Sequence, residues 1–155
     1  MSNVEKVIQI DKNSKKNNSV ILSIVIPSYN SANLLSRCIG ALENQSAKKA
    51  FFEISVADDG STDETVEMLE NFKAKTELKL QWTTIKNSGP ATARNAGVEI
   101  TSGSWIGFLD ADVIPDPDWV KNALKLIRDN PNVGAIEGRT EVTQRERATP
   151  FTHQT

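Results

Sequence analysis

Cysteine and histidine are scarce in this 155-residue sequence, which has one of each, Cys38 and His153. A single cysteine excludes a disulfide within the chain, and a single histidine excludes a zinc site built from several histidines. An excess of one charge is also lacking, because 18 Lys and Arg oppose 20 Asp and Glu for a net charge of −2. This balance disfavours a general nucleic-acid-binding surface, so nucleic acid is not an expected partner. Any metal chemistry must rely on carboxylates.

Long hydrophobic runs are absent as well. No stretch approaches the roughly 18 consecutive apolar residues of a membrane-spanning helix. Residues 1–19 are polar and lack the apolar core of a secretory signal, so we expect a flexible N-terminal arm. These absences predict a cytoplasmic protein without a transmembrane segment. They leave open a peripheral association with the inner face of the membrane.

Two apolar patterns alternate along the chain from residue 20 onward. Short branched apolar runs, typical of strands buried on both faces, occupy residues 21–26, 51–57, 78–85, 105–109 and 133–136. Between these runs, apolar residues recur at the spacing of an amphipathic helix. The clearest helical sets are Leu34, Leu35, Cys38, Ile39 and Leu42; Val66, Leu69 and Phe72; and Trp119, Val120, Ala123, Leu124 and Ile127.

Helix starts are marked by capping residues and by proline. Ser61-Thr62-Asp63-Glu64 fits a capping box that would begin the second helix. Pro90 suits the first turn of the third helix, and Asp116-Pro117 would cap the fourth. The resulting order, β-α-β-α-β-α-β-α-β, predicts an α/β fold. We expect an open, mostly parallel, twisted sheet with helices on both faces, formed by one domain over residues 20–140 and followed by an incomplete polar tail over 141–155.

Polar side chains and glycines gather directly after four of the predicted strands. The four segments are Pro27-Ser28-Tyr29-Asn30, Asp58-Asp59-Gly60-Ser61, Asn87-Ser88-Gly89 and Asp110-Ala111-Asp112. In open parallel sheets, ligands bind beyond the carboxyl ends of the strands. The four polar strand ends therefore indicate one shared site.

The pattern Asp-x-Asp occurs twice, and its context separates the two copies. Asp116-Pro117-Asp118 lies at a predicted helix start, where carboxylates cap amide groups, so we interpret it as structural. Asp110-Ala111-Asp112 directly follows an apolar strand, where two like charges repel and lose hydration. A hard divalent cation such as Mg²⁺ would make that arrangement favourable. An ordinary acidic turn is the alternative.

Two further segments permit both a structural and a functional interpretation. Asp58-Asp59 could belong only to a turn, but a carboxylate there could also accept hydrogen bonds from a nucleotide base or ribose. The small residues of 87–97 and the helix start among them suit an anion. Arg94 could contact a phosphate or form a structural ion pair. Local chemistry alone leaves these alternatives open.

Taken together, the segments resemble the inverting nucleotide-sugar glycosyltransferases of family 2, which have the GT-A fold. The matching stretches, in the family's order, are Pro27-Ser28-Tyr29-Asn30, Asp58-Asp59-Gly60-Ser61-Thr62-Asp63-Glu64-Thr65, Asn87-Ser88-Gly89 with Ala93-Arg94-Asn95-Ala96-Gly97, and Phe108-Leu109-Asp110-Ala111-Asp112 with Pro117-Asp118-Trp119. The resemblance covers about residues 21–140. It implies a GT-A (Rossmann-like) fold and the N-terminal, nucleotide-binding part of such an enzyme.

The resemblance also implies roles for individual positions. Pro27, Tyr29 and Asp59 would line the nucleotide pocket, with Asp59 near the base. Asp112 would hold Mg²⁺ or Mn²⁺ against the diphosphate, and Arg94 would support the loop near the donor. The predicted donor-binding residues are Pro27, Tyr29, Asn30, Asp58, Asp59, Asn87, Gly89, Arg94, Asp110 and Ala111, and the predicted metal ligands are Asp112 and Asp110.

An enzyme of this kind transfers a sugar from a nucleotide-diphosphate sugar, here expected to be a UDP-sugar, to an acceptor hydroxyl with inversion. The acceptor would be a saccharide or a lipid-linked molecule, in keeping with cell-envelope polysaccharide synthesis. The family's catalytic base lies downstream of the Asp-x-Asp motif, in the acceptor-binding part. This chain ends 43 residues after Asp112, and its remaining glutamates, Glu137, Glu141 and Glu146, lack the expected motif. We therefore predict no catalytic residue, and the alternative is a truncated or degenerate, non-catalytic nucleotide-sugar-binding module.

Two other enzyme classes match the sequence less well. Phosphotransferases of the haloacid-dehalogenase type have an Asp-x-Asp motif early in the chain, whereas here it comes late. Dinucleotide-dependent oxidoreductases require Gly-x-Gly-x-x-Gly after the first strand. This chain has Pro27-Ser28-Tyr29-Asn30-Ser31 at that place.

Overall fold

The computed structural model describes residues 20–139 and residue 141, which form four strands, four α-helices and one short 3₁₀ turn. In chain order these are β1 (Leu22–Ser28), α1 (Ala32–Glu43), η1 (Lys49–Phe51), β2 (Phe52–Asp58), α2 (Thr65–Lys73), β3 (Lys79–Thr84), α3 (Pro90–Glu99), β4 (Trp105–Phe108) and α4 (Trp119–Asp129). The order confirms the predicted alternation of strands and helices through α4. Among the described residues, no helix combines the length and the apolar character that crossing a bilayer requires.

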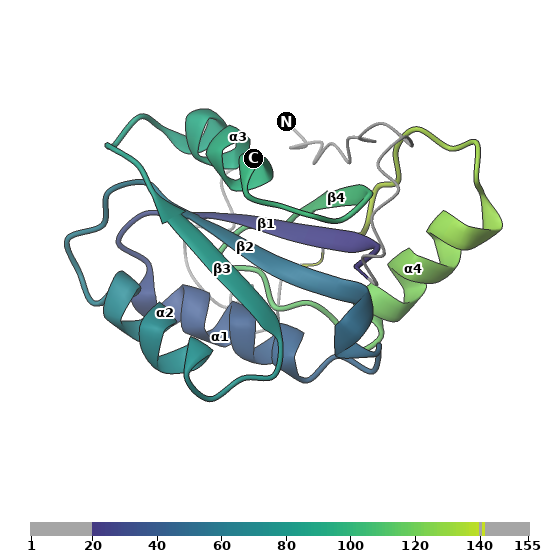
Figure 1. The fold of residues 1–155 in the computed structure, drawn as a ribbon, viewed down its shortest axis with the longest axis horizontal. Helices are drawn as coiled ribbons and strands as arrows, with labels where there is room; N and C mark the ends of the chain where they lie inside the picture. Colours follow the sequence, from purple (N-terminus) through teal and green to yellow (C-terminus); the bar gives the residue numbers. More distant parts are fainter. Residues whose placement is uncertain (1–19, 140, 142–155) are drawn as a thin grey trace, which may run out of the picture.

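The four strands form one parallel, twisted sheet in the order β3-β2-β1-β4 (Figure 1). The register aligns Ser28 of β1 with Asp58 of β2, and Asp58 with Thr84 of β3. The carboxyl ends of these strands therefore meet along one edge, as the sequence predicts. The strand that follows β1 in the chain, β2, pairs with one side of β1, whereas β4 pairs with the other side of β1. Such a reversal of strand order opens a crevice at the carboxyl edge of the sheet.

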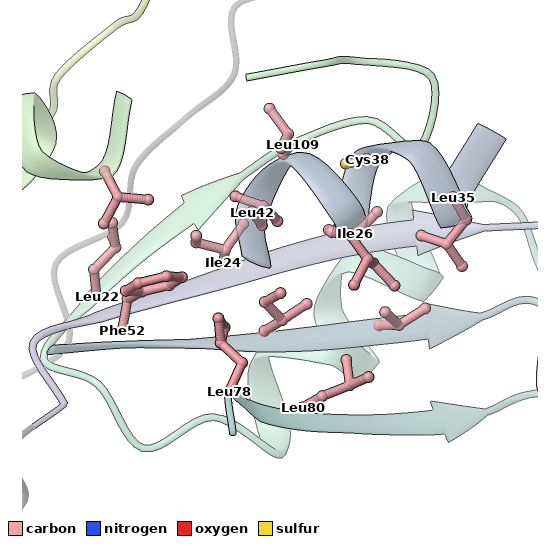
Figure 2. Packing of buried hydrophobic residues seen from close by; sticks show 14 of the residues in the cluster. Leu22, Ile24, Ile26, Leu35, Cys38, Leu42, Phe52, Leu78, Leu80 and Leu109 are labelled. Atoms are coloured by element: carbon pink, nitrogen blue, oxygen red, sulfur yellow. The ribbon is translucent and has the colours of Figure 1, made fainter. Parts of the chain in front are cut away.

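Helices cover both faces of the sheet (Figure 1). On the first face, Leu22, Ile24 and Ile26 of β1 are buried with the apolar side of α1. Figure 2 shows Ile26 beside Leu35 and Cys38 of α1, and Ile24 beside Leu42 of the same helix. Burying this apolar surface is the main force that holds α1 and α2 on the sheet.

The opposite face carries α3, which approaches the sheet closely through small residues. Ala93 and Gly97 are the buried positions of this helix. A Cβ atom added to Gly97 would lie only 2.6 Å from Cγ1 of Val25 and 3.3 Å from Cβ of Ala57. The small residues of this segment therefore allow the helix backbone to pack directly on β1 and β2.

A buried carboxylate, Glu53 of β2, connects the sheet to the loop after α3. Its Oε1 accepts hydrogen bonds from Oγ of Ser23 (2.6 Å) and from the backbone N–H groups of Ser102 (2.5 Å) and Gly103 (3.2 Å). Its Oε2 pairs with Nζ of Lys79 at 2.5 Å. Burial raises the pKa of Glu53, but the hydrogen bonds from Lys79, Ser23 and Ser102 outweigh it and hold that pKa below its usual range.

Three expectations about secondary structure are wrong. Residues 133–136 form no strand, and Val133 and Ile136 instead pack with partial burial against the main core. A short apolar run cannot be identified as a strand from its periodicity alone. The capping box is also wrong, because α2 begins at Thr65 and Glu64 makes no side-chain cap. Asp116 does not cap α4 either, since the helix begins at Trp119 and Oδ1 of Asp116 accepts from the N–H of Asp118, which precedes it. The predicted arm at residues 1–19 and the predicted tail beyond 141 lie outside the described residues.

Candidate functional site

A cleft of about 430 Å³ lies at the carboxyl edge of the sheet, where the strand order reverses. Its walls come from the loops that follow β1, β2, β3 and β4 and from the first turns of α1 and α3. The lining residues are Pro27, Ser28, Tyr29, Ser31, Leu34, Asp59, Asn87, Gly89, Pro90, Ala93, Arg94, Asp110, Ala111 and Asp112.

Most of the predicted donor-binding residues line this cleft, as do both predicted metal ligands. Asn30 and Asp58 are the exceptions, since neither lines it. The residues that sequence reasoning missed are Ser28, Ser31, Leu34, Pro90 and Ala93. Leu34 was assigned to the apolar face of its helix, yet its side chain is 43% exposed. Its place in the first turn after a strand end was the signal that could have identified it.

Asn30 holds the loop after β1 against the loop after β2. Its φ of 46° lies in the left-handed region, which asparagine tolerates better than most residues. Its Oδ1 accepts a hydrogen bond from the backbone N–H of Thr62 (2.8 Å), and its own N–H donates to Oγ of Ser61 (2.8 Å). Oδ2 of Asp63 accepts from the N–H of Ala32 at 3.1 Å. Residues 61–63 therefore bind the neighbouring loop. Asp63 also reaches the start of α2, where its Oδ1 accepts a hydrogen bond from the backbone N–H of Thr65 at 3.1 Å.

The adjacent aspartates Asp58 and Asp59 have different environments. Asp58 is fully buried at the end of β2, and both of its carboxylate oxygens lie 3.3 Å from the backbone N–H of Ser61. Asp59 lines the cleft and accepts hydrogen bonds from the N–H groups of Ser88 (2.7 Å) and Gly89 (2.8 Å). Asp59 therefore connects the loop after β2 with the start of α3.

The start of α3 brings a cation to the acidic loop after β4. Gly89 precedes the helix with a φ of 90°, a conformation that favours glycine, and Pro90 occupies the first turn. One turn further on, Nη2 of Arg94 pairs with Oδ1 of Asp110 at 2.7 Å. Both side chains are partly exposed, so solvent screens the pair and its contribution to stability is small. Of the two roles that the sequence allowed for Arg94, the ion pair is therefore present, and it lies inside the cleft.

Cys38 of α1 lies beneath the loop that carries Asp110 and Asp112. The thiol is completely buried, and Sγ lies 3.8 Å from the backbone oxygen of Asp110. Burial raises the pKa of Cys38 to about 12, and the nearby charges of Asp112 and Asp110 contribute to the increase. The thiol therefore stays protonated at neutral pH and packs as a small apolar group, which excludes it as a nucleophile.

The acidic loop offers two carboxylates to a metal ion. Among the described residues, no three His, Cys, Asp or Glu side chains gather closely enough to enclose a metal by themselves. Mg²⁺ commonly uses only one or two protein carboxylates and completes its coordination with water and substrate phosphates. Asp110 and Asp112, both at the cleft, fit that donor set.

A larger groove of about 590 Å³ lies along α2 and reaches Glu43 at the end of α1. Its walls include Glu43, Glu67, Met68 and Phe72, and none of the predicted site residues line it. The smaller cleft carries the loop residues from all four strand ends and is therefore the candidate functional site.

Comparison with known proteins identifies the family. The model of glycosyl transferase family 2 matches residues 23–154. Validoxylamine A glucosyltransferase of Streptomyces hygroscopicus subsp. jinggangensis (strain 5008) is 36% identical over 104 residues, which are 67% of this chain and 25% of that protein. Poly(ribitol-phosphate) beta-N-acetylglucosaminyltransferase TarS of Staphylococcus aureus (strain Mu50 / ATCC 700699) is 30% identical over 105 residues, 68% of this chain and 18% of that protein. The chain therefore spans a quarter or less of these relatives.

Solved structures show the same fold. S. aureus TarS 1–349 in complex with UDP-GlcNAc superimposes with a TM-score of 0.67 and 30% identity, covering 72% of this chain and 32% of that chain. The mannosyltransferase PcManGT of Pyrobaculum calidifontis, in complex with GDP-Man and Mn²⁺, gives a TM-score of 0.64 and 25% identity, covering 73% and 36%. These matches confirm the GT-A fold, and with the family match they show that this chain belongs to glycosyl transferase family 2.

Proposed function

We propose that this chain forms the nucleotide-sugar-binding part of an inverting, divalent-metal-assisted glycosyltransferase that takes a UDP-sugar as donor. The observation that carries the proposal is the meeting of Arg94, Asp110 and Asp112 in the cleft at the reversal of strand order. A cationic side chain and a divalent metal held by carboxylates can both neutralise the phosphates of a nucleoside diphosphate. The UDP-GlcNAc bound by TarS and the GDP-Man bound by PcManGT support a donor of this class.

The nucleoside end of the donor would lie between the loops after β1 and β2. Tyr29 is 47% exposed at the cleft, and its ring offers a surface on which a base can stack. Each carboxylate oxygen of Asp59 accepts one backbone N–H, which leaves lone pairs for an N–H of the base. The bonds to Ser88 and Gly89 hold that carboxylate in place before the donor arrives.

The diphosphate end would lie between α3 and the acidic loop. Arg94 has five N–H donors in a planar group, so a phosphate can bind without breaking the bond to Asp110. Asp112 is exposed and would be the principal ligand of Mg²⁺ or Mn²⁺, with the second oxygen of Asp110 as a further ligand. When bound, the metal would neutralise charge on the leaving nucleoside diphosphate.

Transfer itself would require a carboxylate base that deprotonates the acceptor hydroxyl. Among the described residues, neither Glu137 nor Glu141 lines the cleft, and Glu141 pairs with Arg139. We therefore assign the base, the acceptor site and the inversion at the anomeric carbon to a part outside the residues described. The relative TarS is a poly(ribitol-phosphate) transferase, which supports a polymeric acceptor.

A non-catalytic nucleotide-sugar-binding module is the second candidate. It is favoured because the carboxylates that line the cleft among the described residues, Asp59, Asp110 and Asp112, are all assigned to the donor or the metal, which leaves none to act as the base. Hydrolysis of the donor would separate the two. A catalytic chain releases UDP from UDP-glucose in the presence of Mn²⁺, whereas a binding module leaves the donor intact.

The test of the donor site is calorimetric titration of UDP, UDP-glucose and GDP-mannose with Mn²⁺ and with EDTA. We expect Mn²⁺ to strengthen UDP binding at least about tenfold, a gain of roughly 1.4 kcal/mol. Asp112→Asn should abolish this gain. Asp129→Asn, which removes an exposed aspartate at the end of α4, is the matched control and should bind as the wild type does. A folded chain that binds none of the three ligands would refute the proposal.

A further inference from the structure

The loop between β4 and α4, residues 109–118, is fastened to α1 near its beginning. Cys38 lies under Asp110, with Sγ 3.8 Å from the backbone oxygen of that residue. The loop closes on itself through the N–H of Val113, which donates to the same oxygen at 3.1 Å. Pro115, further along, is buried. The segment that carries Asp112 is therefore bounded by buried contacts.

The far end of the loop is held by Gln45, just beyond the C-terminus of α1. Its side chain is 8% exposed and does not line the cleft. Nε2 donates to the backbone oxygen of Asp116 (2.7 Å), and Oε1 accepts from the backbone N–H of Val120 (2.8 Å). Both ends of one amide thus bridge the last part of the loop and the first turn of α4.

The neighbouring Ser46 strengthens this attachment. Its N–H donates to the backbone oxygen of Pro117 (2.9 Å), and its Oγ donates to Oδ1 of Asp118 (2.5 Å). Asp118 precedes α4 but makes no side-chain cap on the helix. The first N–H groups of a helix have no acceptor within the helix. Gln45 supplies an acceptor for one of them, the N–H of Val120.

We propose that Gln45 is a positioning residue for the metal-binding carboxylates of the acidic loop. It does not line the cleft, and it acts by fixing the backbone four residues after Asp112. A loop held at both ends loses less conformational freedom when a ligand orders it, so its carboxylates bind a cation more tightly. The inference rests on the proposed metal-assisted donor site.

The test compares Gln45→Met with three reference proteins, using the full 155-residue chain. Methionine has a similar length but neither hydrogen-bonding group. Asn44→Ala removes an amide next in sequence, whose Nδ2 donates to the backbone oxygen of Gly40 of α1 at 2.8 Å. Leu80→Ala lowers stability from a buried position on β3, remote from the loop. The wild type completes the set.

Two quantities are measured for each protein: the Kd of UDP with Mn²⁺ and with EDTA, and the hydrogen exchange rate of the Val113 amide. Val113 is informative because its bond partner is Asp110, not Gln45. In Gln45→Met, we expect the Mn²⁺-dependent gain in affinity to fall about tenfold and Val113 to exchange at least about threefold faster. The Kd in EDTA should stay within about twofold of wild type. Asn44→Ala and Leu80→Ala should keep the full gain.

The outcomes separate this inference from the proposed function. If the wild type gains affinity from Mn²⁺ and Gln45→Met gains equally, the role of Gln45 is refuted and the metal site stands. An unchanged exchange rate at Val113 also refutes it. If the wild type gains nothing from Mn²⁺, the metal site itself fails, and the role of Gln45 fails with it. Should Gln45→Met not fold, Ser46→Ala, which removes one exposed hydroxyl, should reduce the gain about threefold, and an undiminished gain would refute the inference.

Discussion

Replacement of the buried carboxylate Glu53 should destabilise the fold by an amount that depends on pH. In Glu53→Gln the amide oxygen can keep the bonds from Ser23 and from the Ser102 backbone, but the charge is lost. Hydrogen bonds to a charged group contribute about 1.5–3 kcal/mol each and neutral ones about 0.5–1.5 kcal/mol. Two strong bonds weakened in this way cost about 2 kcal/mol. Lys79, the cationic partner, is half-exposed, so it turns to solvent at little further cost.

Glu53→Ala should cost more, about 4 kcal/mol, because buried donors of Ser102 and Gly103 lose their acceptor. Urea unfolding at pH 7, followed by circular dichroism, measures both variants. Glu67→Gln on the exposed side of α2 is the control and should change the free energy of unfolding by less than about 0.5 kcal/mol. A loss in Glu53→Gln no greater than that of the control would refute the account of the buried network.

The pH dependence gives an independent check. The pKa of Glu53 is lower in the folded chain than its ordinary value, so folding favours the ionised form. The resulting stability is fully present above the unfolded-state pKa of about 4.5, and it is lost as the pH falls through the folded-state pKa. The difference between wild type and Glu53→Gln should therefore shrink as the pH falls from about 5 to 3. A difference that stays constant over this range would contradict the reasoning.

Three further substitutions test separate parts of the structure. Ser28→Ala should stabilise the fold by about 1 kcal/mol in thermal unfolding, because no group within the described residues bonds to this buried hydroxyl, and a loss of stability would contradict that. Gly97→Ala should cost about 1–2 kcal/mol, since its Cβ would lie 2.6 Å from a side-chain carbon of buried Val25; unchanged urea unfolding would show that α3 can shift. Arg94→Gln should weaken UDP binding about tenfold while stability falls by less than about 1 kcal/mol. Calorimetry showing unchanged UDP affinity would exclude Arg94 from the phosphate site.

The sequence predicted the helices and strands well where the apolar pattern was long and a residue such as proline marked the start of the element. Pro90 begins α3 as expected, and the apolar spacing of α1 matches its buried residues Leu35, Cys38, Ile39 and Leu42. The prediction of a strand at residues 133–136 is wrong because four residues show too little periodicity to distinguish a strand from a loop packed on the core. Pattern reasoning therefore located the sheet and its carboxyl edge, but not its last predicted strand.

The location of the candidate site could be predicted from the sequence, but the structural role of each residue in it could not. Asp58 and Asp59 are identical in type, adjacent and both buried, yet only Asp59 lines the cleft. The place of each carboxylate at the edge of the sheet, which local sequence does not specify, decides between them. Gln45 carried no signal at all, because its partners lie about 70 residues away along the chain.

The four loops at the carboxyl edge are bonded to one another in series, which bears on how the cleft can work. Asn30 joins the first loop to the second, and Asp59 joins the second to the third. Arg94 reaches from α3 to Asp110 in the fourth, and Gln45 returns from the fourth to α1, which follows the first. Because each loop is restrained by the next, the cleft needs little rearrangement to receive a ligand, which favours binding. The same connection explains why a buried amide outside the cleft can influence carboxylates inside it.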